Sequence, residues 1–151
     1  MAEIYIPKGS HALTTYLVPT DGESLIFFVK NVFHAKEVLR QSGGGGGTHV
    51  ELIIGDSNLM VGIAAGAFEP IRAMFYTYVP DVDAAYRRAI ELGAASLQVP
   101  TDETYGDRRA GFADPFGNMW YVASRIKKSG NSTARRSSVK GRMKTTRKRK
   151  I

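Results

Sequence analysis

His49 and Glu51 are two side chains whose types and spacing could support acid–base or metal chemistry. They lie in the run 49–54, in which apolar residues alternate with others as in a strand. Residues two apart in a strand share a face, so Val50 and Leu52 are expected to face a helix and the His–Glu pair to face a concave side. The pair could contact a ligand, form half of a displaced metal site, or simply be hydrogen-bonded on an exposed strand.

A second group of chemically capable residues lies at 105–109, Tyr-Gly-Asp-Arg-Arg. Arg108 or Arg109 offers a forked donor for an anionic or carbonyl-bearing ligand, and Tyr105 offers a flat wall. The alternative is that Asp107 pairs with an arginine across a turn. Other tyrosines on the inward phase of predicted strands could line an aromatic pocket or be half-buried sheet residues: Tyr16, Tyr76, Tyr78 and Tyr121.

Two similar halves of the chain are expected to position these residues. The first half is expected to contain a strand at 12–18, a helix at 24–41, a mobile glycine loop at 43–47, strands at 49–54 and 58–64, and a loop at 65–71. The second half is expected to contain a strand at 73–79, a helix at 84–92, a strand at 95–99 and a hairpin over 105–124. A short strand is expected just after each helix, and the first of these, near 36–40, overlaps the end of the predicted first helix. Trp120 is expected to lie in the core under the second helix.

Composition separates the chain into an acidic body and a basic tail. Of 151 residues, 43% are hydrophobic and none is cysteine, which excludes disulfides and thiolate chemistry and fits the cytoplasm. Twelve Lys or Arg and no acid occur at 125–151, which leaves nine basic and 14 acidic residues in the remainder. We expect the tail, 126–151, to be disordered, with weak non-specific contact to nucleic acid as one role and a functionless extension as another. Neither a bilayer-spanning run nor a signal peptide is recognisable, so no membrane partner is expected.

Several segments together resemble the vicinal oxygen chelate superfamily, within its glyoxalase/bleomycin-resistance/dioxygenase branch. The resemblance is carried by Leu17-Val-Pro19, Ile26-Phe-Phe28, the segments 49–57 and 79–85, and most specifically by Tyr105-Gly-Asp-Arg108 with Asp114-Pro-Phe-Gly-Asn118 and Trp120. It implies one α+β domain over 1–125, in which two βαβββ modules (about 10–64 and 72–124) form a curled mixed sheet around a concave cavity. It also implies a homodimer.

The resemblance further implies where a divalent metal would be held: by His or Glu on the first and last strand of each module. Carried over to this sequence, those positions fall near Thr14, at 60–62, near Met74 and at Tyr121, with His11 as the nearest substitute for the first. A methionine thioether and a tyrosine phenol are poor ligands for a hard catalytic metal. No cofactor is therefore expected.

The sequence thus predicts a protein that binds a small organic ligand in its concave cavity without the usual metal. The predicted ligand-binding residues are Tyr16, His49, Glu51, Tyr105, Arg108 and Tyr121. One alternative is a metal-dependent lyase or dioxygenase of the same superfamily, with a rearranged site that includes His11, His49 and Glu51. A second alternative is polyanion binding through the tail.

Overall fold

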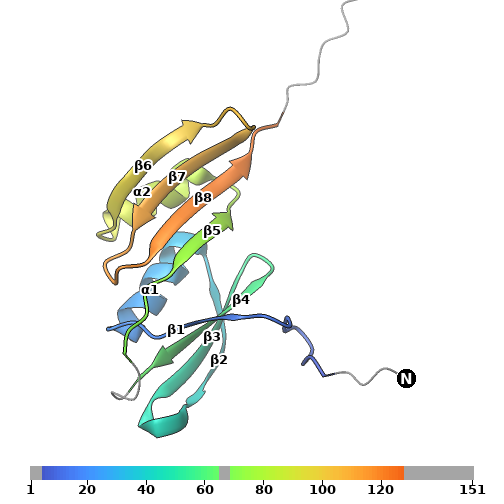
Figure 1. Cartoon of the computed structure of the whole chain (residues 1–151), viewed down its shortest axis with the longest axis vertical. Helices are drawn as coiled ribbons and strands as arrows, with labels where there is room; N and C mark the ends of the chain where they lie inside the picture. Colours follow the sequence, from blue (N-terminus) through green and yellow to red (C-terminus); the bar gives the residue numbers. More distant parts are fainter. Residues whose placement is uncertain (1–4, 65–68, 128–151) are drawn as a thin grey trace, which may run out of the picture.

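The computed structural model describes residues 5–64 and 69–127, and they fold as two consecutive modules (Figure 1). Module one consists of β1 (Thr15–Leu17), α1 (Gly22–Phe33), β2 (Lys36–Ser42), a 3₁₀ turn η1 (Gly44–Gly46), β3 (Thr48–Ile54) and β4 (Ser57–Ile63). Module two consists of β5 (Met74–Tyr78), α2 (Val82–Glu91), β6 (Ala95–Asp102), β7 (Asp107–Ala113) and β8 (Met119–Arg125). Each module therefore has the order βαβββ, which confirms the predicted α+β fold.

The strand order of the two sheets is the same. Module one has the order β1-β4-β3-β2 and module two the order β5-β8-β7-β6. In each sheet the first strand runs parallel to the last, and the other pairs are antiparallel. Within the described ranges, the two sheets do not hydrogen-bond to each other to form one closed sheet.

Both helices begin at an aspartate cap. Asp21 Oδ1 accepts a hydrogen bond from the Ser24 N–H at 3.0 Å, and Asp81 Oδ1 accepts one from the Ala84 N–H at 2.9 Å. The bond from the Ser24 N–H holds the pKa of Asp21 below its usual value. The prediction that α1 extends to 41 is wrong: it ends at Phe33, because His34 adopts the left-handed conformation (φ 55°).

The segment after α1 contains the short strand expected near 36–40. Val38 and Leu39, which continue the helical spacing, belong to this edge strand, β2. The glycine run is not simply a loop, because η1 joins β2 to β3 and the Gly43 N–H donates to the Gly47 carbonyl at 2.8 Å. Residues 65–68 of the predicted loop, and the tail from 128, lie outside the described residues.

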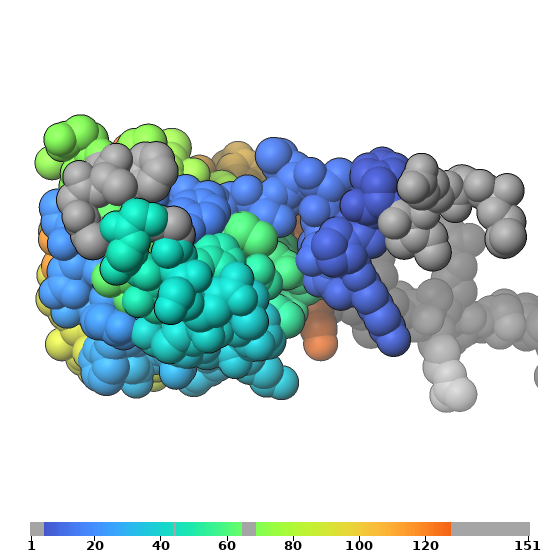
Figure 2. Space-filling model, turned by 90° about the horizontal axis from the view of Figure 1, so that it is seen from below, coloured from blue at the N-terminus to red at the C-terminus, as the bar shows by residue number. Residues whose placement is uncertain are grey.

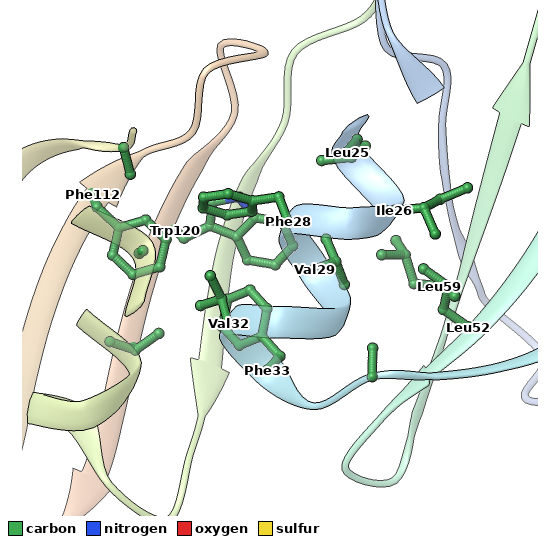
Figure 3. Close-up of a cluster of buried hydrophobic side chains, with 14 of the residues drawn as sticks. Leu25, Ile26, Phe28, Val29, Val32, Phe33, Leu52, Leu59, Phe112 and Trp120 are labelled. Carbon is green, nitrogen blue, oxygen red and sulfur yellow. The ribbon is translucent and has the colours of Figure 1, made fainter. Parts of the chain in front are cut away.

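A single hydrophobic core joins the modules, with α1 at its centre (Figure 3). Ile26 lies toward Leu52 and Leu59 of module one. On the opposite side, the ring centroid of Phe33 is 4.7 Å from that of Trp120 in module two. Trp120 is buried as predicted. No helix in the described part of the chain is long and apolar enough to cross a membrane.

Candidate functional site

The face of each sheet opposite its own helix is called the open face below, and the open face of module one brings together three predicted ligand-binding residues. The Tyr16 hydroxyl is 3.1 Å from His49 Nδ1, and His49 Nε2 is 3.2 Å from Glu51 Oε1. An ionised carboxylate can only accept a hydrogen bond, so Nε2–H donates to Glu51, and in the neutral imidazole Nδ1 then accepts the Tyr16 O–H. This chain of carboxylate, imidazole and phenol could orient a ligand or relay a proton.

Gly62 allows Tyr16 to lie against the sheet. His49 is opposite Gly62 in the β3–β4 register, and a Cβ at Gly62 would come within 2.9 Å of Tyr16 Cε1. Any larger residue would therefore displace the ring and break its stacking on His49, whose centroid is 5.5 Å away. Sequence reasoning missed this residue, although a glycine inside a strand is a known signal of close approach.

His11 is not part of this arrangement. It is exposed in the segment before β1, which projects away from the body of the protein, shown in blue in Figure 2. Across residues 5–64 and 69–127, no group of three or more His, Asp or Glu side chains is placed to hold a metal ion. His49 and Glu51 are the pair that does come together, and a pair does not fit a catalytic metal centre.

The open face of module two is rich in exposed aromatic and methionine side chains. Tyr76 of β5 is directly opposite Tyr121 of β8, and Met74 is opposite Met119. Met74 is 62% exposed and Tyr78 is 65% exposed. Small residues of β7 and β8 share this face: Gly111 and Ala123 are buried beneath the larger side chains, and Ala113 is half-buried.

Arg109 is the cation at the centre of this face. Its guanidinium carbon lies 4.4 Å from the centroid of the Tyr121 ring, and its Nη1 is 3.4 Å from the Tyr105 hydroxyl. Gly111 makes room for the stacked ring, because a Cβ there would come within 2.7 Å of Tyr121 Cε1. Tyr105 and Tyr121, both predicted ligand-binding residues, are thus linked through Arg109.

Arg108, the predicted ligand-binding arginine, lies elsewhere. Its Nε and Nη2 donate to the two carboxylate oxygens of Asp83 on α2 at 2.6 and 2.7 Å, and its Nη1 donates to Asp102 at 2.8 Å. These bonds raise the pKa of Arg108, the one to Asp83 most. The structure therefore places its guanidinium against α2, while Arg109 occupies the open face.

Asp107 of β7 contacts side chains of two other strands of the same sheet, β5 and β8. The Tyr78 hydroxyl donates to Asp107 Oδ2 at 3.1 Å, and Arg125 Nη1 lies 3.0 Å from Asp107 Oδ1. The ion pair that the sequence suggested for Asp107 is thus made with β8 and not across the adjacent turn. Because the neutral Tyr78 phenol is the hydrogen-bond donor, this contact raises its pKa.

Tyr76 should be the phenol that reports most clearly on this face. Desolvation, followed by the influence of the neighbouring Tyr105 hydroxyl, raises its pKa to about 12, although the side chain is 48% exposed. Between the usual value of 10.0 and about 12, the unfolded chain releases this proton first, so the stability associated with the neutral phenol is lost as pH rises. Absorbance at 295 nm should show a late ionisation step in the folded protein. The step should be absent in Tyr76→Phe and in urea-unfolded protein; an unchanged late step in Tyr76→Phe would contradict this assignment.

A hollow of about 370 Å³ lies where the two modules meet. Module one contributes Thr15 and the β3–β4 turn, and module two contributes the β5 strand with Tyr76 and Tyr78. It adjoins the aromatic open face because these tyrosines belong to both. A ligand on that face could therefore extend toward module one.

Comparison with known proteins agrees with this architecture. Residues 6–122 match the profile of the Glyoxalase/Bleomycin resistance protein/Dioxygenase superfamily. An uncharacterised protein of Mycobacterium tuberculosis strain H37Rv is 29% identical over 128 residues, covering 77% of this chain and 75% of that protein.

Solved structures show the same fold. TioX from Micromonospora sp. ML1 superposes with a TM-score of 0.63 at 24% identity, covering 78% of this chain and all of that one. The fosfomycin resistance protein FosX from Listeria monocytogenes gives a TM-score of 0.56 at 18% identity, covering 76% and 93% of the two chains. On the sequence match over 6–122, the chain belongs to the Glyoxalase/Bleomycin resistance protein/Dioxygenase superfamily.

Proposed function

We propose that this protein binds a small organic molecule with a flat aromatic part on the open face of module two, without a resident metal ion. The observation that carries the proposal is the exposed cluster of Tyr76, Tyr78, Met74 and Met119 around small residues of β7 and β8. Exposed apolar side chains gathered on one face typically mark a binding surface. Tyrosine rings supply flat walls with a polar end, which suits an aromatic ligand that also carries polar groups.

Binding can be tested with a neutral bicyclic probe, 2-naphthamide, followed by isothermal titration calorimetry. Saturable binding is expected, and Tyr121→Ala should weaken it about tenfold or more because a stacking wall is removed. Tyr86→Ala is the matched control: that tyrosine lies on α2 and donates to Ser96 Oγ at 2.7 Å, away from the open face. Equal losses in both variants would argue against this location.

The ligand site is proposed to be completed in a homodimer. The Met119 N–H donates to the Ala73 carbonyl, and the Val79 N–H donates to the Ala123 carbonyl. Alternation along β5 therefore directs the backbone groups of Met74, Tyr76 and Tyr78 away from β8, toward an edge that no other described strand covers. Uncharged free edges of this kind favour association with another chain.

The segment before β1 supports the same proposal. Tyr5 is 83% exposed and Leu13 is 89% exposed, so the described part of this chain leaves two large apolar side chains largely uncovered. A second copy could bury them together with the β5 edge. The open face of module one would then be available to oppose module two of the partner.

Light scattering coupled to size exclusion should therefore detect a dimer. Met74→Lys places a charge on the β5 edge and is expected to shift the protein to the monomer. Val99→Lys is the matched control, because Val99 is also 62% exposed but lies on the β6 edge. A monomeric wild-type protein would rule out the dimer proposal.

A second candidate function is an acid–base enzyme of the same superfamily, favoured by the hydrogen-bonded chain of Tyr16, His49 and Glu51. The metal-dependent lyase or dioxygenase considered from sequence would need ligands beyond His49 and Glu51. Elemental analysis of protein purified without a histidine tag separates the metal-free proposal from the metal-dependent alternative. A stoichiometric transition metal would contradict the metal-free proposal.

A further inference from the structure

The charged groups on the open face of module two are unequally matched. Asp107 Oδ1 lies 3.0 Å from Arg125 Nη1, an ion pair by distance that lacks hydrogen-bond geometry, and the Glu103 carboxylate accepts from the Gln98 side-chain amide at 2.7 Å. Arg109 forms no ion pair with any residue in the ranges 5–64 and 69–127. The Tyr105 hydroxyl contributes most to raising the pKa of Arg109, and the Glu103 carboxylate adds to it from beyond ion-pair distance, so a carboxylate in direct contact with Arg109 is lacking among the described residues.

The Arg109 side chain is held in place although it has no acidic partner. Stacking on Tyr121 and the contact with Tyr105 fix its guanidinium plane. Its buried Nε has no hydrogen-bond partner among the described residues. A buried N–H without a hydrogen-bond partner costs free energy, and a ligand oxygen that accepted from it would offset that cost.

We propose that Arg109 is the anion-recognising residue of the site, so that the ligand is a flat aromatic oxyanion such as an aromatic carboxylate. The inference rests on the proposed function and narrows its ligand class. The aromatic part would pack on Tyr76 and Tyr121, and the charged group would meet the guanidinium of Arg109, which lies against the Tyr121 ring. A planar guanidinium recognises a carboxylate through paired charge-assisted hydrogen bonds.

The experiment compares 2-naphthoate with its neutral analogue 2-naphthamide by calorimetry on the full chain. Wild-type protein should bind the carboxylate about tenfold or more tightly, the typical effect of a charge-assisted hydrogen bond. Arg109→Gln should abolish this preference while still binding the amide. The matched control is Arg108→Gln, which removes the adjacent arginine on the helix side and should keep the preference.

Arg109→Lys provides a second variant that keeps the charge but loses the fork, and it should retain a smaller preference. The preference should also decrease as salt increases, whereas amide binding should not change. Equal binding of the two probes by wild type, or a preference that survives Arg109→Gln, overturns this inference while leaving the proposed function intact. If neither probe binds, both this inference and the proposed function are overturned.

Discussion

Replacing Asp114 by alanine is expected to lower the free energy of unfolding by about 3–4 kcal/mol. The side chain is 5% exposed, and its two oxygens accept four hydrogen bonds of 2.9 Å. One oxygen accepts the N–H groups of Phe116 and Asn118, and the other accepts Asn118 Nδ2 and Trp120 Nε1. Alanine would leave these donors buried without partners. Urea denaturation followed by Trp120 fluorescence measures the loss.

Two further variants make this prediction specific to the buried carboxylate. Asp56→Ala changes the aspartate of the corresponding β3–β4 turn, which is exposed and bonds only to Ser57 Oγ among the described residues, so a loss below about 0.5 kcal/mol is expected. Asp114→Asn should be intermediate, because one of the two acceptor sites becomes an NH₂ group facing donors. A loss for Asp114→Ala as small as that for Asp56→Ala would show that the network does not stabilise the fold.

The same network explains why the most specific sequence motif identified the fold more clearly than the site. Asp114 and Asn118 lie in the turn of the hairpin that was predicted over 105–124, and their side chains are buried. Asn118 Oδ1 also accepts from the N–H of Ala73, 45 positions earlier, and so attaches the turn to the residue that precedes β5. The turn could be predicted from local residue types. The contact with Ala73 could not, because it depends on the tertiary pairing of β5 and β8.

The end of α1 and the beginning of β2 show a second limit of prediction from local sequence. Val38 and Leu39 continue a helical spacing, and the polar residues around them are good helix formers, so local pattern favours the helix. In the structure β2 is an edge strand whose residues are mostly exposed, and it is defined by pairing with β3. The left-handed conformation of His34 ends the helix, a role more often taken by glycine.

The alternation of side chains along the strands explains which part of the candidate site could be predicted from the sequence. His49 and Glu51 were predicted to share a face, and the structure places their side chains 3.2 Å apart. For the consecutive arginines, burial of Ala110 and Phe112 determines the phase: Arg108 shares the helix side with them and Arg109 shares the open face with Gly111. That phase was readable from the sequence. The capture of Arg108 by Asp83 was not, because it requires α2 to pack on β7.

The shared core leads to the second large expected effect, on the side chain that joins the two modules. Phe28→Ala is expected to lower the free energy of unfolding by about 3–5 kcal/mol. Phe28 is 2% exposed on α1, and its ring centroid lies 6.2 Å from that of Phe112 and 6.5 Å from that of Phe116. Both partners belong to module two, so truncating a module one side chain would open a cavity at the junction of the modules.

The adjacent residue supplies the matched control, because Phe27 is 59% exposed on the outer side of the same helix. Phe27→Ala should change stability by less than about 0.5 kcal/mol, since little apolar surface is buried there. Calorimetry should show one transition for wild type and for Phe28→Ala, shifted to lower temperature in the variant, because α1 is part of the core of both modules. Two separated transitions in Phe28→Ala would instead mean that each module has enough core to fold independently, and α1 would then belong energetically to module one alone.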